Sequence, residues 1–205
     1  MRALDIPFEE RLMPFKPGSN WEAFRSFSPS GTVPALITSH GAVWDSLAII
    51  EFLAEEYKSV WPTDQAARAW ARCAAAEMHS GFAALRDVCS MSCGVRIKLR
   101  EINPALQQNL VRIDELWCDG LERFGGPFLG GENFTAVDAF FAPVVFRLQT
   151  YGLTLGSEAQ AYAQRMLAVP AMQSWYEQAL QEVWRDVPHD ELCLALGDVI
   201  EDFRA

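Results

Sequence analysis

The chain has 205 residues, of which 27 are acidic and 17 are basic, so its formal net charge at pH 7 is −10. This acidity argues against a nucleic-acid-binding protein, which needs basic side chains to displace counterions, and against binding to anionic membranes. Hydrophobic residues make up 50% and charged residues 21%, a composition typical of a globular protein and too apolar for a disordered one. The length is compatible with one domain or with two small ones.

The cysteines and the apolar runs indicate the cellular compartment of the protein. The first residues contain no apolar run of signal-peptide length. The longest apolar run, 139–146, is too short to span a bilayer and contains Pro143. The five cysteines have no spacing typical of a disulfide framework, and we therefore expect reduced thiols in a cytoplasmic protein. They are Cys73, Cys89, Cys93, Cys118 and Cys193.

The first third of the sequence predicts short elements of mixed type. Residues 8–15 lie between prolines and predict a strand, and residues 16–30 predict one irregular helix. Residues 33–37 and 42–44 predict two strands, and the turn residues 39–41 between them make the pair an antiparallel hairpin.

Asp45 and Ser46 then predict the start of a helix, because both residue types are good N-caps and apolar residues follow at helical spacing. Residues 59–64 predict a linker, since the residue before a proline disfavours helix. Beyond residue 65 no segment predicts a strand. We expect helices over 66–88 and 104–124, another that begins at Thr135, and two more over 157–167 and 170–183. The sequence thus predicts a small α/β unit, residues 1–60, followed by an all-helical unit, residues 65–205.

Three short motifs occur in order along the chain. Residues 28–36, SPSGTVPAL, are similar to a loop that leads into a cis Val-Pro bond, and residues 44–53, WDSLAIIEFL, are similar to a helix start with an acid and a serine. Residues 128–138 join FLGG to FTAVD, a helix-capping pattern. In this order and at these separations the motifs resemble the glutathione S-transferase family over essentially the whole chain. The resemblance implies a thioredoxin-like N-terminal unit followed by an all-α helical bundle.

The first two motifs point to a ligand site. A cis bond at Val33–Pro34 turns the backbone N–H and C=O of Val33 outward, where they can pair with a peptide as an added strand does. Free amides and the helix dipole at Asp45 and Ser46 favour an anion. By the resemblance the ligand is glutathione, with Ser46 holding its γ-glutamyl carboxylate and Asp45 supporting its ammonium. The alternatives are a trans proline at a strand edge and a purely structural N-cap.

The third motif predicts a structural role. Thr135 and Asp138 have the spacing of a capping box, in which the cap residue and the N3 acid satisfy orphan amides reciprocally. By the resemblance this box fixes the central helix of the second unit and touches no ligand.

The resemblance also implies a co-substrate pocket between the two units. We expect its walls to include Met91, Cys93 and Arg96, on the first helix of the helical unit. Arg96 is suited to an acidic co-substrate, because a guanidinium pairs bidentately with a carboxylate; the alternative is a solvated basic edge that includes Lys98 and Arg100. Cys89 and Cys93 are expected to be two small buried hydrophobes, and no metal site is expected.

One part of the family pattern is not found. By the resemblance, residues 1–8 match the end of the family's first helix and the strand after it, so the family's first strand and its catalytic Ser, Tyr or Cys do not appear. That strand is central in the family's sheet, and without it two rows of backbone groups lack partners. A start codon assigned too late, a divergent member that repacked and a shortened chain all stay open. The catalytic residue is therefore unassigned.

Taken together, the resemblance implies a cytoplasmic homodimer with glutathione as co-substrate and no metal. The glutathione thiolate would attack a small electrophile, either conjugating or isomerising it. The alternative is a non-catalytic binding or scaffold protein on the same fold.

Overall fold

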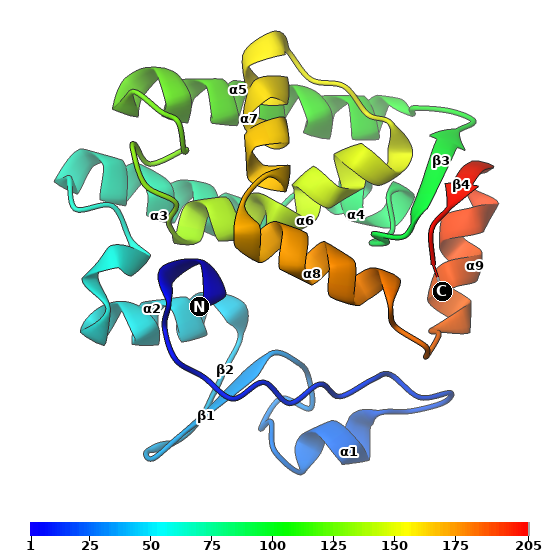
Figure 1. The fold of residues 1–205 in the computed structure, drawn as a ribbon, viewed down its shortest axis with the longest axis horizontal. Helices are drawn as coiled ribbons and strands as arrows, with labels where there is room; N and C mark the ends of the chain where they lie inside the picture. The colour runs from blue at the N-terminus through cyan, green and yellow to red at the C-terminus, as the bar shows by residue number, and fades with distance from the viewer. Residues whose placement is uncertain (205) are drawn as a thin grey trace.

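A strand pair and one long helix form the N-terminal part of the computed structural model, which describes residues 1–204 (Figure 1). β1 (Ala35–Thr38) and β2 (Gly41–Trp44) pair antiparallel, in a register that runs from Ala35↔Trp44 to Thr38↔Gly41. α2 (Ser46–Glu56) follows at once, so the predicted hairpin and helix are both confirmed. The shorter elements are η1 (Arg2–Leu4), α1 (Trp21–Arg25) and η2 (Lys58–Val60).

The predicted strand over residues 8–15 is wrong. The segment is extended but pairs with no strand, and Figure 1 shows it running as coil beneath η1 and past the hairpin. Pro7 and Pro14 lack the N–H that a ladder needs, and Phe8 and Leu12 are exposed rather than packed in a core. The helix expected over 16–30 is limited to the five residues of α1, because Pro17 and Gly18 disfavour helix before it.

The rest of the chain is mainly helical. The predicted helices over 104–124 and 157–167 are confirmed with their bounds, and that over 170–183 ends three residues early. The elements are α3 (Gln65–Ser80), α4 (Ala83–Val88), β3 (Val95–Leu99), α5 (Pro104–Phe124), α6 (Ala136–Tyr151), α7 (Ser157–Leu167), α8 (Pro170–Leu180), α9 (Val187–Ala195) and β4 (Gly197–Asp202).

Two details of this part differ from the sequence prediction. The helix expected over 66–88 is broken at Gly81 and Phe82, where Phe82 has a left-handed φ of 58°. The expectation of no strand beyond residue 65 is wrong, because β3 and β4 pair antiparallel between Val95↔Asp202 and Leu99↔Gly197. The partner strands lie about a hundred residues apart, so the local pattern around β3 gave no sign of the pairing.

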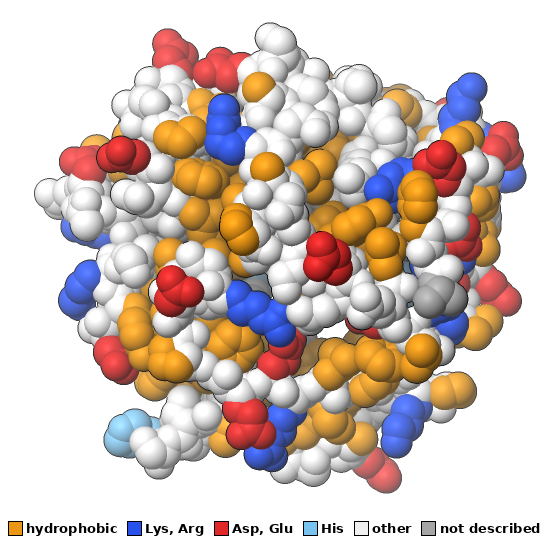
Figure 2. Space-filling view, in the orientation of Figure 1, with side chains coloured by type: hydrophobic (Ala, Val, Ile, Leu, Met, Phe, Trp, Pro, Cys, Tyr) orange, Lys and Arg blue, Asp and Glu red, His pale blue; other side chains and the backbone are white. Residues whose placement is uncertain are grey.

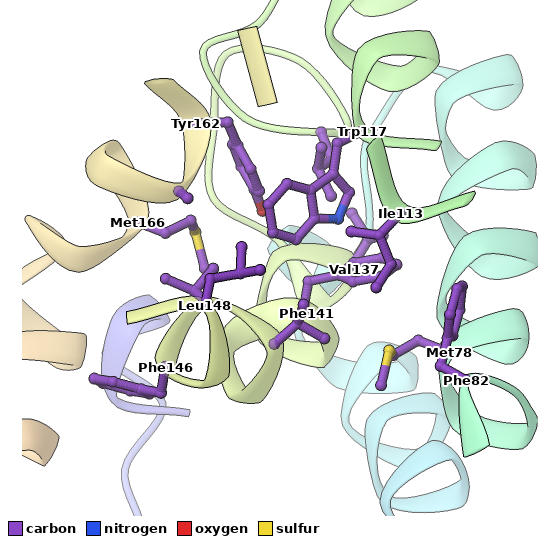
Figure 3. Close-up of a cluster of buried hydrophobic side chains, with 14 of the residues drawn as sticks. Met78, Phe82, Ile113, Trp117, Val137, Phe141, Phe146, Leu148, Tyr162 and Met166 are labelled. Carbon is purple, nitrogen blue, oxygen red and sulfur yellow. The ribbon is translucent and has the colours of Figure 1, made fainter. Parts of the chain in front are cut away.

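The core centres on aromatic contacts between α5, α6 and α7 (Figure 3). The Trp117 ring lies edge-on to Phe141, at 5.7 Å between centroids, and to Tyr162, at 4.8 Å. Such pairs add to the free energy gained from burying the rings. None of the helices within residues 1–204 has the length and apolarity needed to cross a bilayer.

The predicted capping box at the start of α6 is confirmed and is fully buried. The Asp138 carboxylate accepts hydrogen bonds from the backbone amides of Thr135 (2.8 Å) and Leu129 (3.0 Å). The Tyr162 hydroxyl also donates to it, at 2.9 Å. Burial raises the pKa of Asp138, and these donors oppose that rise. One side chain therefore ties the preceding loop and α7 to the first turn of α6.

We predict that Asp138→Ala destabilises the fold, because two amides and the hydroxyls of Tyr162 and Thr135 lose this acceptor inside the core. The expected loss is about 3 kcal/mol, since each buried unpaired group costs roughly 1–3 kcal/mol and part of this is relieved by relaxation. At about 2–4 °C per kcal/mol, the melting temperature should fall by roughly 10 °C in a calorimetric scan. Glu132→Ala, at an exposed acid of the preceding loop, is the control; equal melting temperatures for the two variants would contradict the role of Asp138.

Candidate functional site

A cavity of about 740 Å³ opens between the N-terminal domain and the last helices. Figure 2 shows this face hollowed between α8 and the N-terminal segment, with hydrophobic side chains gathered at the lower rim. One wall comes from residues 8–15, residues 33–36 and Ile49 of α2. The other comes from residues 91–94, from α8 and α9, and from the connection between these helices.

The Val33–Pro34 peptide bond is cis, as the sequence predicts, and both residues line the cavity. Val33 is exposed and lies two residues before the start of β1. Within residues 1–204 neither its amide nor its carbonyl takes part in a hydrogen bond. Both groups are therefore free to pair with an extended ligand at the cavity wall.

Asp45 and Ser46 lie beside the cavity but do not line it. Ser46 is the first residue of α2, and its hydroxyl has no hydrogen-bond partner within residues 1–204. Ile49, three residues further along the same helix face, does line the cavity. The N-terminus of α2 is thus about one helical turn from the cavity wall.

Asp45 is already engaged within the chain. Its Oδ1 accepts a hydrogen bond from the Leu47 amide at 2.8 Å, and its Oδ2 lies 3.2 Å from Nε2 of His79 on α3. Its backbone has φ 73° and ψ 130°, outside the left-handed helical region, a strained conformation for a residue other than glycine. A ligand ammonium at Asp45 would share a carboxylate that also caps α2.

The predicted co-substrate residues are placed differently from one another. Met91 and Cys93 line the cavity, whereas Arg96 does not. The expectation that they share a helix is wrong, because Met91 and Cys93 follow α4 in an irregular segment and Arg96 lies on β3. The irregular segment is held in place from α6 instead of by its own helix.

Arg96 is occupied by contacts inside the protein. Its guanidinium donates to the carbonyls of Cys93 and Val95, both at 3.0 Å, and to the Tyr176 hydroxyl at 3.1 Å. It also lies over the Phe203 ring, 5.1 Å from the centroid. Arg96 therefore joins β3 to α8 and to the C-terminal residues, and forms neither a free carboxylate-binding group nor part of a solvated edge.

Three side chains of α6 fix the cavity wall between α4 and β3. Arg147 Nε donates to the Cys89 carbonyl at 2.7 Å, and the Tyr151 hydroxyl donates to the Ser90 carbonyl at 2.9 Å. The Thr150 hydroxyl donates to the Ser92 carbonyl. Since Asp138 holds the start of the same helix, the capping box and the wall of the cavity are linked through α6.

The cysteines near the cavity are buried small groups, as expected. Burial raises the pKa of the Cys89 thiol to about 12 and that of the Cys93 thiol to about 11. At neutral pH both are protonated and therefore poor nucleophiles. Residues 1–204 contain no cluster of three or more His, Cys, Asp or Glu suited to hold a metal ion.

Sequence reasoning missed the wall formed by α8, α9 and the residues between them. His189 lines the cavity, with Nε2 2.7 Å from the Met91 carbonyl oxygen and 3.1 Å from Ser90 Oγ. Trp175 lines it from α8 and packs edge-on to Phe146. Pro188 in the first turn of α9 is a helix-start signal in the sequence, but no local pattern places that helix beside residues 90–91.

The fold and the cavity define a class of protein: a thioredoxin-like domain followed by an all-helical domain, with a ligand-sized cavity between them. Comparison of the sequence with known families agrees. The model of the glutathione S-transferase N-terminal domain matches residues 1–56, and that of the glutathione S-transferase C-terminal domain matches residues 64–178. The chain belongs to the glutathione S-transferase family.

Solved structures share the fold at low sequence identity. A glutathione transferase homolog from Burkholderia, with bound glutathione, is 23% identical, has a TM-score of 0.63, and matches over 87% of this chain and 86% of that chain. The Tau class enzyme of mango, Mangifera indica, is 21% identical with a TM-score of 0.62, over 94% and 86%. The theta class enzyme of Xanthomonas axonopodis pv. citri, with glutathione bound, is 23% identical with a TM-score of 0.53, over 78% of each chain. No curated protein matches the sequence.

We predict that Cys93 resists alkylation although it borders the cavity. With a thiol pKa of about 11, roughly one thiol in a thousand is ionised at pH 8. Iodoacetamide followed by peptide mass spectrometry should therefore label the exposed Cys73 first, and labelling of Cys93 should accelerate up to about pH 11. Labelling of Cys93 at the rate of Cys73 at pH 8 would contradict the protonated, desolvated thiol.

Proposed function

We propose that the protein binds glutathione at the Val33 wall of the cavity and at the N-terminus of α2. The observation that carries this proposal is the unpaired Val33 amide and carbonyl at the wall of a cavity large enough for a small-molecule ligand. Glutathione is a peptide, and a peptide pairs with exposed backbone groups as an added strand does. Membership in the glutathione S-transferase family supports the assignment.

Two parts of glutathione, its central peptide and its γ-glutamyl end, match the backbone groups of the wall and the polar groups at the start of α2. Val33 and Pro34 would face its central peptide. The free Ser46 hydroxyl and the first amides of α2 would hold the γ-glutamyl carboxylate, because helix N-termini attract anions. Asp45 would face the ammonium beside that carboxylate. The donors are local, so they can attract an anion even though the whole chain carries a charge of −10.

The reaction would take place in the part of the cavity lined by Met91, Cys93 and Trp175. There the glutathione thiolate would attack a small electrophile, conjugating or isomerising it. The similar Burkholderia and Xanthomonas structures contain bound glutathione, which supports glutathione as the co-substrate. They do not identify the electrophile. Arg96 is not part of this proposal, because its guanidinium is engaged elsewhere.

A second function, glutathione binding without catalysis, is favoured by one observation. The thiol that lines the cavity, Cys93, is protonated at neutral pH, and the hydroxyl beside it belongs to Ser92 on the wall opposite Val33. Neither side chain comes from the thioredoxin-like domain, which by the resemblance supplies the activating hydroxyl or thiol.

Three further properties belong to the same proposal. The boundary between the domains falls in residues 60–65, giving units of 1–60 and 65–205, and this range contains the end of η2 and the start of α3. The protein is a homodimer, and it works in the cytoplasm. The last two properties rest on the family resemblance and on the absence of a disulfide pattern in the sequence.

We predict that the chain binds glutathione in isothermal titration calorimetry and that Ser46→Ala weakens this binding about tenfold, by removing one hydrogen bond to a charged group. Ser157→Ala is the matched control, since Ser157 is the first residue of α7 and does not line the cavity. Asp45→Asn keeps the cap of α2 and removes the charge, so it should weaken binding without unfolding the helix. No binding at millimolar glutathione, or equal affinities for Ser46→Ala and the control, would refute the site.

We predict further that glutathione and chlorodinitrobenzene, a general electrophilic probe, give the thioether product faster with the protein than without it. Ser46→Ala should lower the rate at subsaturating glutathione by about the same factor as it lowers affinity. Tight glutathione binding together with no rate above the uncatalysed reaction, for this and other electrophiles, would favour the non-catalytic function instead.

A further inference from the structure

A second hollow, of about 370 Å³, lies over the connection between α2 and α3. Figure 1 shows this connection at the left edge of the ribbon. Its walls come from the last turns of α2, from η2, from residues 61–63 and from the first turns of α3. It shares no lining residue with the cavity of about 740 Å³. The proposed glutathione site uses none of its side chains.

The lining of this hollow is strongly basic. Three of its seven lining residues are cations and none is acidic, in a chain whose net charge is −10. Lys58 comes from η2, while Arg68 and Arg72 lie one helical turn apart on the same face of α3. Like charges gathered in a concave place repel one another and concentrate a positive potential there.

Two of these cations are held in place by the backbone and keep donors free. Arg68 donates from Nη1 to the carbonyls of Pro62 (3.0 Å) and Thr63 (2.8 Å), and its Nε and Nη2 have no partner within residues 1–204. Lys58 Nζ donates to the Glu55 carbonyl at 2.9 Å, which uses one of its three protons. Both side chains are therefore oriented by the backbone and keep donors that no protein group occupies within residues 1–204.

The third cation, Arg72, is oriented by an acid and an aromatic ring. Its Nε and Nη2 donate to the two Glu51 oxygens, both at 3.0 Å, and its Nη1 has no partner in the described chain. Its guanidinium carbon lies 5.5 Å from the Trp61 ring centroid. The three cations together with Glu51 carry two positive units, which a dianion would neutralise.

Trp61 gives the hollow an apolar side. It lines the hollow and is 3% exposed, yet its indole N–H has no hydrogen-bond partner within residues 1–204. A buried N–H without an acceptor is unfavourable.

We propose that this hollow binds a phosphate group carried on a small molecule. Arg68 and Arg72 would donate to the phosphate oxygens in the planar fork that suits them, and Lys58 would act as a point charge. The volume exceeds that of a bare ion and lies in the range of small-molecule sites, about 300–1,000 Å³. The Trp61 ring borders the space left for the group that carries the phosphate.

Titration calorimetry of the full chain with phenyl phosphate and with inorganic phosphate tests the site. Binding should weaken at least about tenfold in Arg68→Gln and in Arg72→Gln, and should weaken as salt is added. Arg123→Gln is the matched control, because Arg123 also pairs with an acid, Asp119, and lies over an aromatic ring, Phe124.

The outcomes separate the sources of the phosphate. Tighter binding of phenyl phosphate than of inorganic phosphate supports the proposal, whereas equal affinities would overturn the organic carrier and leave a site for free phosphate. No binding at millimolar concentrations, or binding that Arg68→Gln weakens no more than Arg123→Gln, overturns the proposal. If Arg68→Gln fails to fold, as judged by circular dichroism, Lys58→Gln replaces it, since Lys58 makes a single backbone bond.

Discussion

The buried carboxylate of Asp138 is the interaction on which the rest of the helical domain depends. It accepts hydrogen bonds from the loop before α6, from the cap of α6 and from Tyr162 on α7, so it sets how α6 enters the core. α6 in turn donates from Arg147 and Tyr151 to the segment that forms one wall of the cavity. A structural cap, more than 40 residues from that segment in sequence, thereby positions the site.

The sequence predicted the elements whose ends are marked locally. Asp45 caps α2 through the Leu47 amide, Asn103 caps α5 with Pro104 after it, and Gly125 ends α5 in a left-handed conformation. Such signals lie within a few residues of the boundary, so they can be found in one sequence. Elements that depend on a distant partner were missed. β3 and β4 become a sheet only when Val95 and Asp202 meet, and α9 has no strong cap of its own.

The same distinction applies to the candidate site. Val33, Pro34, Asp45 and Ser46 belong to local motifs, and the sequence placed them at a loop and a helix start, where the structure has them. The opposite wall comes from segments that the sequence does not bring together. Arg96 is the clearest example: as a charged residue near Met91 and Cys93 it looked free, but Tyr176 and Phe203 engage it. Arg96 lies on β3, whose partner strand is about a hundred residues away, so the direction of its side chain depends on packing that a single sequence does not reveal.

The proposed site pairs glutathione with the backbone of Val33 and holds its γ-glutamyl carboxylate at the start of α2. A crystal structure of the full chain soaked with glutathione tests this most directly. We expect the ligand's peptide amide and carbonyl to lie within hydrogen-bond distance, about 2.7–3.2 Å, of the Val33 groups, and its carboxylate within that distance of Ser46. Glutathione bound elsewhere, with Val33 and Ser46 unpaired, would contradict the account.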